Sequence, residues 1–174
     1  MKKGISGRFA LAQLTTAAVL MALTIAFCSF SIPVPGGHLY FCDVAICTAA
    51  LLLDPFLALI VGGVGAFLGD LIFYPLPMFV SLVTHGLQAL VISLFARYVL
   101  KKTPRLSSAL GLALGIVILV TGYSLGRAYI YATPAYAVAK LPYEFLQGLI
   151  GAAAAMFLYW KTPLRKIYAR TTGN

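Results

Sequence analysis

Few residues of this sequence could do chemistry, and the most conspicuous is an acid within an apolar stretch. Asp70 lies in GGVGAFLGDLIFYPLPMF, residues 62–79, with no lysine or arginine within 25 positions on either side. Burying a carboxylate in hydrocarbon costs about 2.5 to 3.5 kcal/mol, so such acids usually face a cavity or a polar partner. The chain breaks at YPLP one turn later, and we therefore expect Asp70 at the rim of a cavity.

Three other apolar segments carry polar side chains at helical spacing. The set is Ser81, Thr84, His85 and Gln88 in one segment, Tyr123, Arg127 and Tyr131 in another, and Glu144 and Gln147 in a third. Residues three or four apart share a helix face, so these groups would form one pocket with Asp70 if the helices bundle. Hydrogen bonding between helices is the alternative for each polar residue alone. Arg127 and Lys140 could instead snorkel outward, or pair with Glu144 or Asp70.

Recognised catalytic, nucleotide and metal motifs are missing. Leu68 stands where a dinucleotide fingerprint needs glycine, and no GxxxxGK[ST] occurs, so P-loop binding of ATP is excluded. No HExxH occurs, and the three cysteines form no CxxC, so we predict no metal, no cofactor and cysteines that pack as small apolar residues. Ser81 and His85 resemble a nucleophile and its base, but no GxS motif supports that role. Asp43 begins an apolar segment, where we expect its carboxylate to cap backbone N–H groups.

The composition indicates that this chain is embedded in lipid. Of 174 residues 61% are hydrophobic and only 10% charged, and the mean hydropathy is +0.97, which a soluble domain of this size could not bury. The net charge of +9 would suggest nucleic acid in a soluble protein, but its distribution indicates a membrane. Eleven of the thirteen basic residues fall in three short tracts that we place on the cytoplasmic side, beside lipid headgroups: Lys2, Lys3 and Arg8; Arg97, Lys101, Lys102 and Arg105; and Lys161, Arg165, Lys166 and Arg170.

Hydropathy predicts an all-α integral membrane protein with six transmembrane helices in a single domain, residues 1–174. The helices are expected at about 9–30, 43–53, 56–73, 78–100, 107–131 and 141–160, with the first retained rather than cleaved as a signal peptide. Six spans put both termini and the basic tracts on the same, cytoplasmic side. The connections 32–42, 74–77 and 131–140 would then lie outside.

Small residues predict where helices approach closely. Ala18, Ala22 and Ala26 repeat every fourth position in the first helix, and such rows form grooves for another helix in lipid. That partner could be a helix of this chain or of another protein. Glycine and alanine rows in the helices at 56–73 and 141–160 could satisfy the internal packing and leave the first row free.

These features together resemble a known family. The alanine row, IPVPGGHLYFCD before a short second helix, LDPFLALIVGGVGAFLGDLIFY and LPYEFLQG resemble the substrate-binding S components of energy-coupling factor (ECF) transporters. Within that group the chain looks most like the riboflavin-transporter-related proteins assigned to pyrimidine thiamin precursors or vitamin B6. The resemblance covers essentially the whole chain.

The resemblance implies a bacterial plasma-membrane subunit that captures a vitamin or vitamin precursor from outside and delivers it inward by toppling in the membrane. Ala18, Ala22 and Ala26 would dock on a transmembrane T subunit, and two cytoplasmic ATPase subunits would supply energy. The expected lid residues are His38, Tyr40 and Phe41. The expected pocket residues are Asp70, Tyr74, His85, Gln88, Tyr123, Arg127, Glu144 and Gln147.

Two other functions stay open at this stage: a self-sufficient small secondary transporter, and an intramembrane enzyme built on Ser81 and His85 or on the two acids. An inverted repeat, typical of many secondary transporters, is not evident in the sequence. The ligand is open too, because pyridoxine, hydroxymethylpyrimidine, riboflavin-like compounds and modified-base precursors would all fit an aromatic, mildly acidic pocket.

Overall fold

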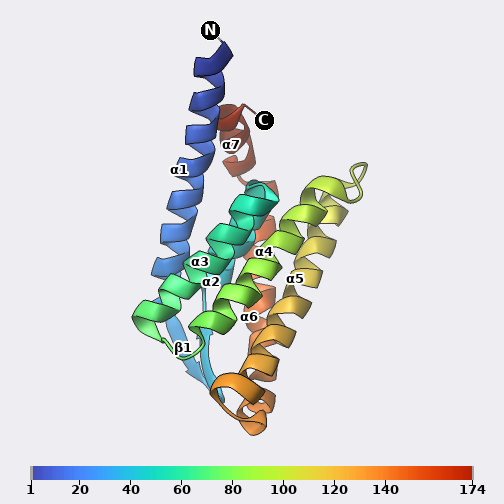
Figure 1. Cartoon of the computed structure of the whole chain (residues 1–174). Helices are drawn as coiled ribbons and strands as arrows, with labels where there is room; N and C mark the ends of the chain where they lie inside the picture. The colour runs from blue at the N-terminus through green and yellow to red at the C-terminus, as the bar shows by residue number, and fades with distance from the viewer. Residues whose placement is uncertain (1, 174) are drawn as a thin grey trace.

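The chain folds into an elongated helical bundle with one small hairpin (Figure 1). The computed structural model describes the backbone of residues 2–173 and the side chains of residues 11–173. Its elements are α1 (Lys2–Cys28), β1 (Ser31–Val34), β2 (Gly37–Tyr40), α2 (Cys42–Leu52), α3 (Pro55–Phe73), α4 (Met78–Tyr98), α5 (Pro104–Gly126), the π-helix η1 (Arg127–Tyr131), α6 (Pro134–Lys161) and α7 (Leu164–Thr172). The basic side chains of Lys2, Lys3 and Arg8 lie outside the described residues.

Five of the six predicted spans are confirmed as helices that are long and apolar enough to cross a membrane. Within the described residues these are 11–28 of α1, then α3, α4, the continuous segment Pro104–Tyr131, and α6. The second predicted span is an apolar helix of 11 residues, α2, which at 1.5 Å per residue covers only about 16 Å. A sixth full span is therefore not confirmed.

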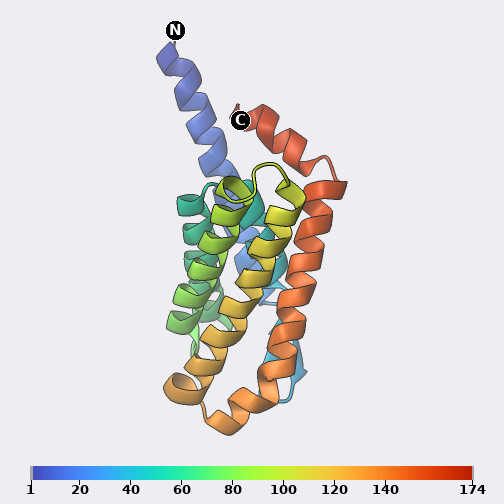
Figure 2. The ribbon, with the colours of Figure 1, turned by 90° about the vertical axis from the view of Figure 1, so that its right-hand side faces the viewer.

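The two ends of the bundle differ in character. Both termini and the basic connection at residues 99–103 lie at one end, where α1 extends beyond the other helices (Figures 1 and 2). The β1–β2 hairpin, the α3–α4 connection and η1 lie at the opposite end. This arrangement agrees with the up-and-down path expected from the sequence.

The short helix α2 forms the centre of the bundle. It packs against α1, α3, α4 and α6, and ten of its eleven residues are buried. Its last carbonyl groups would be costly to leave unbonded in an apolar setting. Ser93 Oγ donates to the Leu53 carbonyl oxygen at 2.7 Å, Arg97 Nε donates to the same oxygen at 3.0 Å, and Arg97 also bonds the carbonyl of Leu52. Side chains of α4 thus satisfy the carbonyl groups at the C-terminal end of α2.

Helix capping occurs at a different aspartate from the one predicted. Asp54 is the N-cap of α3, where its Oδ1 accepts from the backbone N–H groups of Phe56 at 3.0 Å and Leu57 at 3.1 Å. At the start of α2 no side chain caps the helix, and Phe41 occupies the N-cap position. The capping role predicted for Asp43 is therefore wrong, because its carboxylate turns into the bundle toward α4 and α6.

The predicted loop 131–140 is mostly helix. Only Ala132 and Thr133 connect η1 to α6, which begins at Pro134. Thr133 Oγ1 accepts from the N–H of Tyr136 at 3.4 Å, and proline is suited to the first position of a helix because its missing N–H has no helical partner there. Pro134 thus starts a helix within the segment that was predicted to be a loop. The amphipathic helix α7, which packs on α1, was also not predicted.

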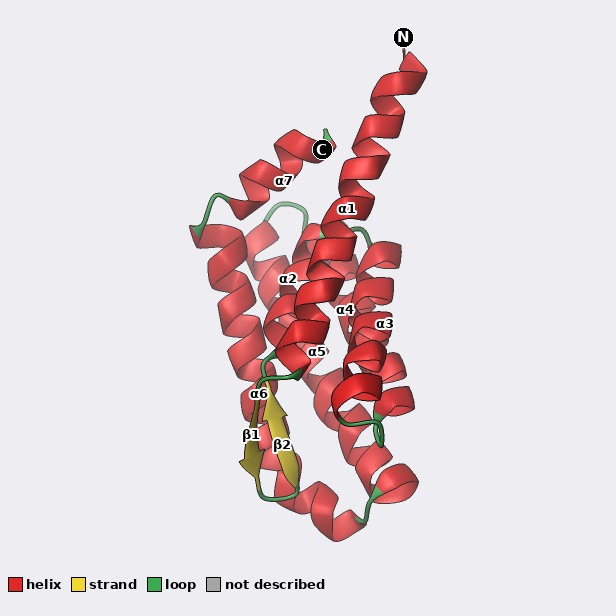
Figure 3. Cartoon of the chain, turned by 90° about the vertical axis from the view of Figure 1, so that its left-hand side faces the viewer, coloured by secondary structure: helices red, strands yellow, loops and turns green. Residues whose placement is uncertain are grey.

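The segment after α1 folds back as an antiparallel hairpin. Ser31 pairs with Tyr40 and Val34 with Gly37, and the strands lie beside α6 at the end remote from the termini (Figure 3). Gly36 has a φ of +81°, and a Cβ there would lie 2.7 Å from the carbonyl oxygen of Tyr136. Only glycine allows the tip of the hairpin to rest this closely on α6.

Some rows of small residues pack against other helices of this chain, whereas another row is exposed on the surface. A Cβ at Gly62 in α3 would lie 2.7 Å from the carbonyl oxygen of His85 in α4, so the two helices are in close backbone contact. Ala18, Ala22 and Ala26, by contrast, are exposed on the outer face of α1. The alanine row is therefore not used in packing within this chain.

Gly151 controls the approach of α2 to α6, and a larger residue there should destabilise the fold. A Cβ at Gly151 would lie 2.5 Å from Cβ of Asp43. We expect Gly151→Val to cost about 1 to 3 kcal/mol through overpacking, seen as a lower melting temperature in detergent. The control Ala153→Val lies on the exposed face of the same helix and should change stability little. Equal melting temperatures for the two variants would contradict the close contact.

Candidate functional site

A cavity of about 220 Å³ opens among the helix ends near the hairpin. Its walls come from the end of α1, the hairpin, the start of α2, and α3 to α6 with η1. Nine of the eleven residues predicted for the site line it: His38, Tyr40, Asp70, Tyr74, His85, Tyr123, Arg127, Glu144 and Gln147. Phe41 and Gln88 do not line the cavity. Phe41 is the half-buried N-cap of α2, and Gln88 lies fully buried behind the wall.

Asp43 holds the deep wall of the cavity together. Its Oδ1 accepts from Gln88 Nε2 at 3.0 Å, and its Oδ2 accepts from Gln147 Nε2 at 2.7 Å. Gln147 Oε1 in turn accepts from the backbone N–H of Tyr40 at 3.0 Å. One buried carboxylate therefore links α2 to α4 and α6, and through Gln147 to the hairpin.

The same network fixes the proton on His85. Gln88 gives its amide N–H to Asp43, so its Oε1 faces the imidazole, with His85 Nδ1 at 2.7 Å. An amide oxygen only accepts, so Nδ1 is the donor. Among the described residues Nε2 has no hydrogen-bond partner, and the ring lies edge-on to Tyr123 with the centroids 5.4 Å apart. The ring of His85 therefore lines the cavity with its Nδ1 proton committed to Gln88.

A second chain of hydrogen bonds ends on Asp70. Ser81 Oγ donates to Asp70 Oδ2, so the hydroxyl of Tyr123, 2.5 Å from Ser81 Oγ, must donate to the serine. Asp70 Oδ1 has no hydrogen-bond partner among the described side chains, although the residue is only 7% exposed and lines the cavity. Ser81 and His85 are not hydrogen-bonded to each other, and each is engaged elsewhere, so the nucleophile and base suggested by their spacing are not assembled.

Charged residues of η1 and α6 meet at one side of the cavity, where Arg127 and Glu144 line the wall and Lys140 does not. Arg127 Nη1 lies 2.8 Å from Glu144 Oε1, and Lys140 Nζ lies 3.5 Å from the same oxygen. Of the alternatives left open for Arg127 and Lys140, pairing with Glu144 is the one observed. Lys140 is 1% exposed, and its Nζ has no hydrogen-bond partner in the part of the chain that the structure describes. Two cations thus share one carboxylate in a buried setting.

The hairpin supplies an aromatic cover. His38 lies 5.9 Å from Tyr74 and 6.2 Å from Tyr40, measured between ring centroids. Burial, reinforced by the nearby Asp70 carboxylate, raises the pKa of the Tyr40 phenol well above its ordinary value of 10.0, so its hydroxyl stays protonated. His38 Nδ1 is buried and has no hydrogen-bond partner among the residues described.

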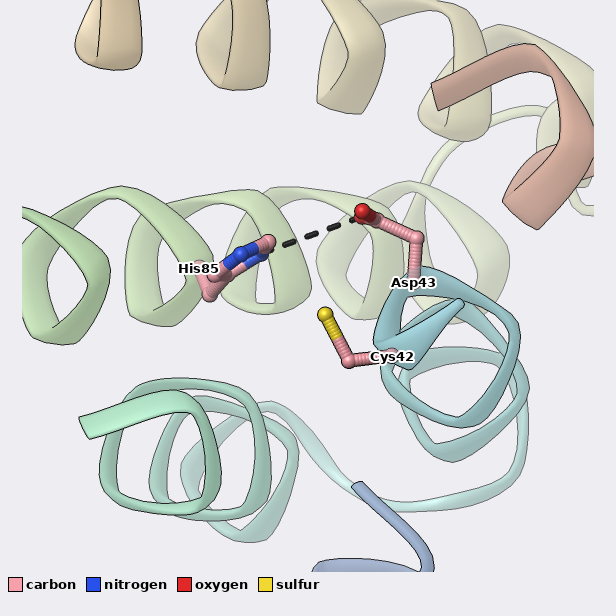
Figure 4. Close-up of side chains that lie close together, drawn as sticks. All are labelled: Cys42, Asp43 and His85. Carbon is pink, nitrogen blue, oxygen red and sulfur yellow. Dashed lines mark ion pairs between the residues drawn. The ribbon is translucent and has the colours of Figure 1, made fainter. Parts of the chain in front are cut away.

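Three potential metal ligands meet where the sequence showed no metal motif. Cys42 Sγ, a carboxylate oxygen of Asp43 and a ring nitrogen of His85 all lie within 4.8 Å of one another, and the cysteine and aspartate point toward the histidine (Figure 4). The ion pair drawn there joins His85 Nδ1 and Asp43 Oδ1 at 3.8 Å. Both oxygens of Asp43 accept amide hydrogens from Gln88 and Gln147.

Comparison with known proteins identifies the family. The model of the family described as "ECF-type riboflavin transporter, S component" matches residues 8–166, nearly the whole chain. The chain belongs to this S component family. The resemblance to the S components of ECF transporters is thereby confirmed, and the family is one of transporter components rather than of enzymes.

A relative from Pyrococcus woesei also covers most of the chain. It is described as an uncharacterized protein in the gap 3' region, and it is 32% identical over 132 residues, which make up 75% of this chain and 86% of the relative. Membership of the S component family and the five long apolar helices together establish a multi-pass membrane protein.

Sequence reasoning missed the central role of Asp43. Its position at the start of an apolar helix resembled a cap, and the two glutamine partners lie 45 and 104 positions away along the chain. The sequence did contain a signal for this role, since the cost of burying a carboxylate that was considered for Asp70 applies equally to Asp43.

Removing the acceptors of Asp43 should destabilise the bundle in a graded manner. Asp43→Ala leaves two buried amide groups without an acceptor, and each such loss costs about 1 to 3 kcal/mol. Asp43→Asn retains one acceptor oxygen. We therefore expect melting temperatures in detergent to fall in the order wild type, Asp43→Asn, Asp43→Ala. An alanine variant as stable as the wild type would show that Asp43 does not hold these helices.

Proposed function

We propose that this chain is the substrate-binding subunit of an ECF-type importer, capturing a small vitamin or vitamin precursor of the pyridoxine or hydroxymethylpyrimidine class. The observation that carries the proposal is the convergence of costly polar side chains from separate helices on one cavity within an S component fold. Ligand pockets are typically concave, mostly apolar and furnished with a few polar groups that fix orientation. Residues that only joined helices would not need to surround a void.

The proposed orientation places the cavity outside and both termini in the cytoplasm. Support comes from the basic side chains at the end that carries the termini, among them Lys101, Lys102 and Arg170, since cytoplasmic connections are rich in lysine and arginine. The hairpin, with His38 and Tyr40, would then act as the outer lid. A bacterial plasma membrane remains the predicted location.

The proposed partners are a transmembrane T subunit and two cytoplasmic ATPase subunits. No P-loop motif occurs in this sequence, so energy from ATP would have to come from other chains. The exposed row of Ala18, Ala22 and Ala26 offers a surface that a helix of the T subunit could approach closely.

Ligand binding should depend on the charge of Glu144. We expect Glu144→Gln to weaken binding of the ligand at least tenfold, equivalent to about 1.4 kcal/mol, because it removes the carboxylate charge that balances Arg127 in the cavity wall and Lys140 beside it. The measurement is titration calorimetry of the purified chain with pyridoxine, hydroxymethylpyrimidine and riboflavin. The matched control Asp54→Asn removes a carboxylate at the other end of the bundle and keeps a residue that caps helices well. Unchanged affinity in the folded Glu144 variant would remove this residue from the site.

Assembly should depend on the alanine row. Ala22→Leu fills the groove on α1, and we expect it to abolish co-purification with the T subunit and ATPases while ligand binding survives. The control Ala153→Leu adds the same side chain to the exposed face of α6 and should leave assembly intact. Assembly that tolerates Ala22→Leu would place the partner elsewhere. Ligand accumulation in vesicles that contain this chain alone would instead favour a self-sufficient transporter.

A further inference from the structure

The cavity presents unmet acceptors and unmet donors on different walls. Asp70 in α3 uses Oδ2 for Ser81, and its Oδ1 has no partner in the described part of the chain. Within the described residues, the side chain of Arg127 in η1 makes one hydrogen bond, from Nη1 to Glu144. Both residues are 7% exposed and both line the cavity, so their unused atoms face its interior.

Opposite charges are in excess at these two sides of the cavity. Arg127 in the wall and Lys140 buried behind it bring two positive charges to the single carboxylate of Glu144, and Lys140 Nζ has no hydrogen-bond partner among the described residues. Asp70 forms no ion pair with any side chain that the structure describes. The helix α3 packs on α1 and α4, whereas α6 packs on α2 and α5, and Figure 3 shows α3 and α6 on opposite sides of the bundle. The cavity is therefore electrically polarised from one side to the other.

Size and lining restrict the shape of a guest. The cavity volume of about 220 Å³ lies below the range of roughly 300 to 1,000 Å³ typical of sites for drug-sized ligands. The rings of Tyr40, Tyr74, His85, Tyr123 and Tyr131 contribute to the walls, and aromatic faces favour stacking on a flat ring. One aromatic ring with short substituents satisfies both restrictions better than a fused three-ring system.

We infer that the guest is a small dipolar nitrogen heterocycle, a single ring that carries an N–H or protonated nitrogen toward Asp70 and an ionised or strongly accepting oxygen toward Arg127. This inference rests on the proposed function and narrows its ligand class. A simple cation would leave Arg127 without an anionic partner in the guest, and an anion would leave Asp70 facing it without a donor. A hydroxypyridine combines both groups in one ring, because its nitrogen can hold the proton that its phenolic oxygen gives up.

Among the vitamin classes considered, this favours pyridoxine over hydroxymethylpyrimidine and riboflavin. Pyridoxine carries a ring nitrogen and a phenolic hydroxyl on one six-membered ring. Hydroxymethylpyrimidine has an amino donor and ring nitrogens but no acidic hydroxyl. Riboflavin has three fused rings and a long polyol chain.

Analogue binding to the purified chain tests the inference. The probes are pyridoxine, its 3-deoxy analogue, in which hydrogen replaces the phenolic hydroxyl, and its benzene analogue, in which C–H replaces the ring nitrogen. For the wild type we expect each analogue to bind at least tenfold more weakly than pyridoxine by titration calorimetry. Wild-type protein that binds all three equally would overturn the inference, and this arm needs no variant.

Two variants test which side chain recognises which group of the ligand. In Arg127→Gln the 3-deoxy analogue should bind nearly as tightly as pyridoxine, while the benzene analogue should still bind more weakly. In Asp70→Asn the benzene analogue should bind nearly as tightly as pyridoxine, while the 3-deoxy analogue should still bind more weakly. Asp54→Asn is the control and should preserve both penalties, and the melting temperature reports whether each variant is folded. Penalties that persist unchanged in both folded variants would place recognition elsewhere.

The outcomes separate this inference from the proposed function. Tight binding of hydroxymethylpyrimidine or riboflavin with no binding of pyridoxine would overturn the dipolar ligand and leave the chain an S component. Failure of the complete importer in vesicles to take up any of the three compounds would contradict both.

Discussion

The structure depends on satisfying one buried carboxylate from several helices at once. In lipid, no water is available to bond an isolated charge, so Asp43 is tolerable only where donors surround it. Gln88 from α4 and Gln147 from α6 supply those donors, and both distances are those of strong hydrogen bonds. Because the three residues lie on three helices, the requirement of one side chain fixes the relative placement of a large part of the bundle.

That constraint also explains why a cavity survives in a close-packed interior. Side chains tied up in fixed directions cannot collapse into the space beside them, since collapse would break the bonds that make their burial tolerable. Gln147 faces Asp43 on one side and the Tyr40 backbone on the other, so it fastens the hairpin over the cavity. The polar network therefore both builds the deep wall and anchors the cover, and glycines such as Gly36 and Gly151 permit the close approaches it needs.

Hydropathy and charge predicted the parts of this fold that depend on composition. The long helices α1, α3, α4, α5 and α6 follow from apolar length, and the shared end of the two termini follows from the basic tracts. The helical spacing of His85 and Gln88, and of Glu144 and Gln147, correctly put polar groups on inward faces. What these patterns could not supply was pairing: whether Arg127 meets Glu144 or Asp70 depends on helix rotation and tilt, which tertiary packing sets. The errors at Asp43 and Pro134 have the same origin, because a carboxylate or a proline near a helix end has two local interpretations that only the surroundings distinguish.

The separation of roles among the acids has a functional consequence. Asp43 has both oxygens engaged by protein groups and contributes position, whereas Asp70 keeps one oxygen unengaged within the cavity and Glu144 balances two cations. A site of this kind is preorganised, because the groups that would meet a guest are held by others that do not. Its selectivity would then come from matching unmet groups rather than from contact area, since a guest lacking one polar atom leaves a buried partner unpaired. On this argument, a change of ligand within the family would require altered residues at the positions of Asp70 and Arg127, while the network around Asp43 could remain the same.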